Sequence, residues 1–166
     1  GEIVPSVLQM LMEREPSQLD NSWVQFISLG LALLFLSRQD ASDATIETLK
    51  AIEHPVSREA QILVDACSYA GTGNVLKIQS LLHDCAEHVT PDSKKEGGSE
   101  QTANESEGAR NWYQAFSVLA IALVAMGEDV GAEMTLRHMS HLMHYGDPVI
   151  RRTVPLALAL LNPSNP

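Results

Sequence analysis

The sequence predicts an all-α fold, a solenoid of antiparallel helical hairpins. Short alanine-rich apolar segments recur along the chain, amphipathic segments with helical spacing separate them, and nothing reads convincingly as a strand. The apolar segments align without gaps on four alanines, and five residues after each alanine stands a residue that commonly ends a helix. The alanines are Ala32, Ala66, Ala122 and Ala157, and the expected helix ends are Ser37, Gly71, Gly127 and Asn162.

The spacing of the alanines indicates one interrupted repeat. The intervals are 34, 56 and 35 residues, and a period in the mid-thirties is typical of helical-hairpin arrays. The middle interval is longer than the other two, and its extra residues fall at 89–110. This stretch lacks leucine, isoleucine and aromatic residues and is rich in Ser, Glu, Gly and Lys. Such a composition cannot offset the entropy cost of ordering, so we predict a disordered insertion loop, either a tolerated insertion or a tethered binding segment.

Each hairpin is expected to join an outer, two-faced helix to an inner, almost wholly apolar one. Charges on one stripe place the first kind at the surface, whereas apolar residues all round bury the second kind. The outer helices are predicted at 3–14, 41–52, 74–87 and 129–144, and the inner helices contain 29–37, 64–71, 119–127 and 154–162. Pro16, Pro55 and Pro148 mark turns. We expect residues 1–166 to form a single segment of a longer array, because solenoids need polar capping repeats and neither end supplies one.

Charge and composition exclude several partner classes. The chain of 166 residues carries 21 acids against 11 Lys and Arg, a formal charge of −10, so phosphate backbones and anionic membranes are disfavoured. No unbroken apolar run, including 29–36, is long enough to cross a bilayer. Two cysteines cannot form a disulfide framework. We therefore expect no nucleic-acid or membrane partner and a location in the cytoplasm and nucleus.

No pattern of catalytic or metal-binding residues stands out. His138, His141 and His144 recur every third residue and so spread around a helix, and no cysteine or carboxylate lies in register to complete a metal site. The glycines in residues 69–74 follow a predicted helix and are better explained as a turn than as a phosphate-binding loop. Asp65 lies in an apolar helix and needs a partner, which makes it a structural residue. We predict no enzyme, no metal and no cofactor.

An acidic face is the feature with the clearest functional meaning. Asp40, Asp43 and Glu47 have the spacing i, i+3 and i+7, which places them on one face of an outer helix. Gln9 and Glu13 occupy the equivalent face of the preceding outer helix, and Ser80 and Asp84 that of the following one. Exposed charges usually serve solvation alone. Three adjacent outer helices with aligned acids favour a docking face for a basic partner instead.

The chain resembles the proteasome/cyclosome repeat family of helical scaffolds. The resemblance rests on the alanine- and glycine-rich inner helices and on the strings MLMEREPSQL, YAGTGNVLKIQSLL, AMGEDVGAEM, HLMHYGDP and RRTVPLALAL. It covers the whole chain except residues 89–110. It implies a fragment of a toroid of helical hairpins in a large, non-catalytic scaffold at the base of the proteasome's regulatory particle.

The resemblance also implies partners and site residues. In the family, three neighbouring outer helices bind ubiquitin and the ubiquitin-like domains of shuttle factors, and other regulatory-particle subunits surround the scaffold. The family's acidic pair falls on Asp43 and Glu47, with Asp40 in place of a further acid, and the flanking helices supply the remaining residues. Lys50 and Lys77 reduce the negative charge of this face. The alternative is a purely architectural segment that braces neighbouring proteasome subunits.

Overall fold

The structure, a computed structural model, describes residues 3–86 and 100–162, except for the side chains of Asp40 and of residues 100–111. Within these ranges the chain contains helices and turns but no strand, which confirms the predicted all-α class. The elements are α1 (Ile3–Met12), α2 (Pro16–Leu19), α3 (Ser22–Leu33), the 3₁₀ helix η1 (Gln39–Ser42), α4 (Asp43–Lys50), α5 (Pro55–Ser68), α6 (Val75–Ala86), α7 (Glu100–Ala125), α8 (Asp129–Tyr145) and α9 (Pro148–Leu161).

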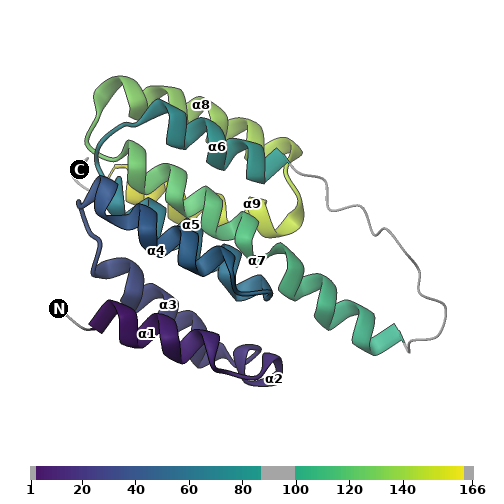
Figure 1. The fold of residues 1–166 in the computed structure, drawn as a ribbon. Coiled ribbons are helices and arrows are strands. Elements are labelled where there is room, and N and C mark those ends of the chain that lie inside the picture. Colours follow the sequence, from purple (N-terminus) through teal and green to yellow (C-terminus); the bar gives the residue numbers. More distant parts are fainter. Residues whose placement is uncertain (1–2, 87–99, 163–166) are drawn as a thin grey trace.

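The helices form two rows of neighbouring elements (Figure 1). In the inner row α3 packs on α5, α5 on α7 and α7 on α9, while α1, α4, α6 and α8 lie along the other side. This arrangement confirms the predicted alternation of inner and outer helices. The four aligned alanines are each at most 2% exposed. Because alanine has the smallest apolar side chain, it allows neighbouring helices to approach closely.

The turns that follow the inner helices repeat the same geometry. Ser37, Gly71 and Gly127 all have positive φ, of 59°, 70° and 83°, the left-handed conformation that commonly ends a helix. The amide of Ser37 donates to the carbonyl of Cys67 at 3.0 Å, and the amide of Gly71 donates to that of Leu123 at 2.9 Å. These acceptors each lie one residue after an aligned alanine. The repeat seen in the sequence is therefore also a repeat of backbone hydrogen bonds between successive hairpins.

Two clusters of buried side chains form the core. One gathers apolar residues of α1, α3, α4 and α5 around fully buried Val24 and Leu49, and the other joins α5, α6, α7, α8 and α9 around Ile121 and Met139. Leu123 of α7 packs against both clusters. Burying one such large side chain stabilises the folded chain by roughly 1.5–3 kcal/mol. Because both clusters contain side chains from inner and outer helices, this burial holds the outer helices in place against the inner row.

Some boundaries differ from those predicted. The three prolines predicted to mark turns, Pro16, Pro55 and Pro148, each open a helix. The short α2 was not predicted. α7 begins at Glu100 and so includes residues 100–110, which we predicted as loop. This stretch has no proline and contains Ala, Glu, Gln and Arg, residues that extend a helix at little cost. Residues 89–99 of the predicted loop lie outside the described residues.

Candidate protein-docking groove

A groove runs between the outer helices α4 and α6, with α5 at its base. Its volume is about 390 Å³. Helix α4 supplies one wall, α6 the other, and α5 lies between them because it packs against both α4 and the inner helix α7. The lining residues are Asp43, Ile46, Glu47, Lys50, Gln61, Ile62, Asp65, Lys77, Ser80, Leu81 and Asp84. The groove thus combines apolar side chains with both acids and bases.

Four of the seven predicted site residues line this groove: Asp43, Glu47, Ser80 and Asp84. The first three are exposed, and Asp84 is half-buried. Gln9 on α1 and Glu13, which directly follows that helix, are exposed. Helix α1 contacts α4, but neither residue lines the groove. The amide Nε2 of Gln9 donates to Oε1 of Glu13 at 2.6 Å. Asp40 lies in η1, before α4 begins at Asp43, and its side chain is outside the described part of the chain.

Two reciprocal ion pairs join α5 to α6. Arg58 of α5 donates through Nη2 to Oδ1 of Asp84 at 2.9 Å, and Lys77 of α6 donates through Nζ to Oδ1 of Asp65 at 2.7 Å. The base lies on α5 in the first pair and on α6 in the second. Each cation also lies over a tyrosine ring, Arg58 at 4.0 Å from the centroid of Tyr113 and Lys77 at 4.6 Å from that of Tyr69. These contacts fix both cations in place.

The α4 wall carries most of the uncompensated negative charge. Lys50 donates to Glu47 at 2.6 Å, but this pair is exposed and therefore weak. Asp43 is exposed and forms no ion pair with any residue that the structure describes. Four carboxylates and two lysines line the groove, a net charge of −2. A basic group on a partner would thus be attracted most strongly to the α4 side.

The base of the groove includes residues that were not predicted as site residues. Asp65 was expected to need a partner, and the structure supplies Lys77. Ile46 is half-buried and Ile62 and Leu81 are buried, so apolar atoms lie between the charged walls. A signal for the ion pairs was present in the sequence, because each helix carries a base and, seven residues later, an acid. Two antiparallel helices bring such pairs into register.

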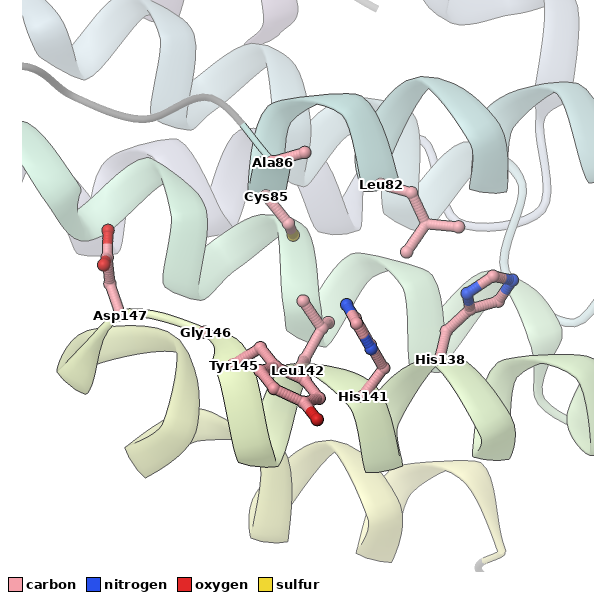
Figure 2. A pocket seen from close by; sticks show the side chains of 9 residues that line it. All are labelled: Leu82, Cys85, Ala86, His138, His141, Leu142, Tyr145, Gly146 and Asp147. Carbon is pink, nitrogen blue, oxygen red and sulfur yellow. The ribbon is translucent and has the colours of Figure 1, made fainter.

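A second groove, of about 380 Å³, lies between the C-terminal parts of α6 and α8 (Figure 2). Figure 2 shows Leu82 and Cys85 of α6 facing His138 and His141 of α8 across it. The rings of His141 and Tyr145 are in contact, with 4.8 Å between their centroids and a tilt of 37° between their planes. Burial raises the pKa of the Cys85 thiol to about 12, with a smaller contribution from the charge of Asp84. This thiol is protonated at neutral pH and is therefore a poor nucleophile and a poor metal ligand.

The described residues are also informative in what they lack. They contain no group of three or more His, Cys, Asp or Glu side chains that could hold a metal ion. None of their helices combines the length and the apolar character that crossing a membrane requires.

Comparison with known proteins identifies the family. No protein-family model matches the chain, but curated relatives align along all of it. It is 55% identical over 166 residues to the 26S proteasome regulatory subunit rpn1 of Schizosaccharomyces pombe and 47% identical over 167 aligned residues to the regulatory subunit rpn-1 of Neurospora crassa. The chain belongs to this proteasome subunit family. A further member, the 26S proteasome non-ATPase regulatory subunit 2 of Dictyostelium discoideum, is 42% identical over 165 residues.

The match to the non-ATPase regulatory subunit 2 family is complete for the chain but partial for its members. The alignments cover 99–100% of the chain and 16–17% of the length of these three relatives. The chain therefore corresponds to about one sixth of a family member. The names of these relatives describe them as regulatory subunits of the 26S proteasome.

Proposed function

We propose that this segment is a non-catalytic receptor within the proteasome regulatory particle, and that it binds ubiquitin and the ubiquitin-like domains of shuttle factors on the outer face of α1, α4 and α6. Such a segment would act wherever proteasomes act, in the cytoplasm and nucleus. The observation that carries the proposal is the groove between α4 and α6. It unites Asp43 and Glu47 with Ser80, Asp84 and apolar side chains on one accessible surface.

The chemistry of the groove suits that kind of partner. Ubiquitin-like domains present an apolar patch ringed by Lys and Arg. The acids of the α4 wall would attract the basic ring, while the accessible atoms of Ile46 on the same wall offer an apolar contact. An interface of this kind is small, at or below about 1,200 Å² in total, and therefore weak and reversible. Rapid release suits a receptor that must pass its cargo on.

Helix α1 extends the same row of outer helices. Its Gln9, and Glu13 just after its end, are exposed and joined by a hydrogen bond. Beside them, Ile3, Val7 and Met10 with Ser6 line a shallow, mostly apolar depression. A ubiquitin-like domain that covers the α4–α6 groove, or a second domain next to it, would find a further polar and apolar surface there.

A binding measurement with matched charge reversals tests the proposal. Fluorescently labelled ubiquitin is titrated with the chain and with the variant Asp43→Arg/Glu47→Arg, and anisotropy reports binding. We expect at least a tenfold loss of affinity, about 1.4 kcal/mol, because like charges then face the basic ring. The control Glu53→Arg/Glu133→Arg reverses two exposed acids outside the groove and alters the net charge equally. The proposal fails if the wild-type chain does not bind, or if both double variants lose affinity alike.

The architectural alternative has one observation in its favour. Phe26 and Leu33 of α3 are 71% and 54% exposed, whereas Ala60 and Cys67, at the repeat-equivalent positions of α5, are buried. An exposed apolar helix face of this kind suits contact with further protein. If bracing neighbouring subunits is the whole function, the chain binds no ubiquitin, and Phe26→Ser/Leu33→Ser prevents the subunit from assembling into the regulatory particle.

A further inference from the structure

We propose that Lys77 is a specificity-determining residue of the α4–α6 groove: its ammonium group, held in the groove by Asp65, lowers the attraction for basic groups so that charge alone does not suffice for binding. The inference rests on the proposed function, because it concerns the same surface. The partner class that the groove then selects is a folded domain with an apolar patch beside its basic side chains, in preference to an unstructured polycation.

The position of Lys77 is fixed from two directions. Its Nζ lies 2.7 Å from Oδ1 of Asp65 and 4.6 Å from the ring centroid of Tyr69. The side chains of Lys77 and Asp65 are only 30% and 20% exposed. A surface lysine normally moves freely in water and screens little, but this one is held at the base of the groove, between the walls that bear Asp43, Glu47 and Asp84.

The pair has a clear electrostatic consequence. Asp65 and Asp84 both line the groove, yet Lys77 and Arg58 already contact their carboxylates. A partner therefore meets acids that have no cation of α5 or α6 beside them only on the α4 wall. Without Lys77, a third carboxylate would become available at the centre, and the lining would change from a net charge of −2 to −3. A flexible polycation gains most from such a change, because charge is its only means of binding.

The main test variant is Lys77→Gln, which removes the charge but keeps a donor for Asp65. Lys77→Met serves as a second variant, and circular dichroism confirms that both are folded. The control Arg137→Met also removes one positive charge, from an exposed pair with Glu133 on α8 at 2.6 Å, away from the groove. The double variant Asp65→Asn/Lys77→Gln removes both charges of the pair and leaves the net charge unchanged.

Two probes are titrated at low and at physiological salt: labelled ubiquitin and a labelled octalysine peptide. We expect Lys77→Gln to bind octalysine roughly tenfold more tightly at low salt and ubiquitin only two- to threefold more tightly, with a steeper salt dependence for both. Arg137→Met and Asp65→Asn/Lys77→Gln should stay within twofold of the wild type for both probes.

The outcomes separate this inference from the proposed function. If the wild-type chain does not bind ubiquitin, the proposed receptor function fails, whereas the octalysine titration still decides whether Lys77 controls the charge of the groove. The inference is overturned if both Lys77 variants bind octalysine as the wild type does, or if Arg137→Met has the same effect. It is also overturned if the double variant binds as tightly as Lys77→Gln, because charge would then not be the cause.

Discussion

The amide of Ser37 donates a hydrogen bond to the carbonyl of Cys67 at 3.0 Å, which ties the turn after α3 to the end of the next inner helix, α5. The equivalent bond from Gly71 to Leu123 ties α5 to α7 in the same way. In both places the donor has positive φ, so the left-handed conformation both ends one helix and aims an amide at its neighbour. The spacing of the hairpins, and with it the width of the α4–α6 groove, depends on these turns.

The first prediction concerns the conformation of Ser37. It is the one non-glycine residue with positive φ in the described ranges, while the equivalent turns use Gly71 and Gly127. Ser37→Gly should therefore stabilise the chain by roughly 0.5–1 kcal/mol. Gly71→Ala should destabilise it by about 1–2 kcal/mol, because alanine is strained at φ 70°. Urea unfolding followed by circular dichroism measures both, and a loss of stability in Ser37→Gly would contradict this account of the turn.

The second prediction concerns Glu59, a buried carboxyl group of α5 that is 5% exposed. Burial raises its pKa to about 7, although a hydrogen bond to Gln25 opposes the shift. Because the folded-state pKa is the higher one, the carboxyl favours folding below about pH 4.5, and this contribution is lost as the pH rises to about 7. Glu59→Gln should thus gain stability over the wild type with rising pH, by up to roughly 3 kcal/mol at pH 8.

Paired urea titrations at pH 5 and pH 8 check this expectation for Glu59. The difference between variant and wild type isolates Glu59, because every other residue is common to both proteins. An advantage of Glu59→Gln that is equal at both pH values would rule out the raised pKa.

The third prediction concerns the strength of the Asp65–Lys77 pair. The double-mutant cycle of Asp65→Asn and Lys77→Met should give a coupling energy of about 1 kcal/mol, at the upper end for exposed pairs, since both groups are partly buried. The exposed pair Glu133–Arg137 should give about 0.3–0.5 kcal/mol in the matching cycle. Equal coupling in the two cycles would show that Lys77 is no better fixed than a surface lysine.

The fourth prediction concerns the two thiols, Cys67 and Cys85, which are both buried. Burial raises the pKa of both, that of Cys85 to about 12. A thiol-specific reagent at pH 8 should therefore label neither cysteine in the folded chain but both in urea. Mass spectrometry of timed samples distinguishes the sites. Rapid native labelling of Cys85 would mean that the groove between α6 and α8 opens more widely than the structure shows.

The sequence predicted the rows of helices better than it predicted contacts between them. Helical periodicity and the aligned alanines depend on residues close together in the chain, so the inner and outer helices were found. Asp84 shows where this approach fails: its position on α6 placed it on the predicted face, but its contact with Arg58 depends on the register of two antiparallel helices. Asp43 and Glu47 were placed more simply, because both follow from the spacing on one helix.

The most direct test of the central claim, that α4 and α6 form the docking surface, is an NMR titration of the ¹⁵N-labelled chain with unlabelled ubiquitin. We predict that amide shifts change along Asp43–Lys50 and Val75–Ala86 and saturate with a weak affinity, and that Asp43→Arg/Glu47→Arg removes these changes. Shifts confined to α8 and α9 or to the exposed face of α3, or no shifts at all, would contradict the claim.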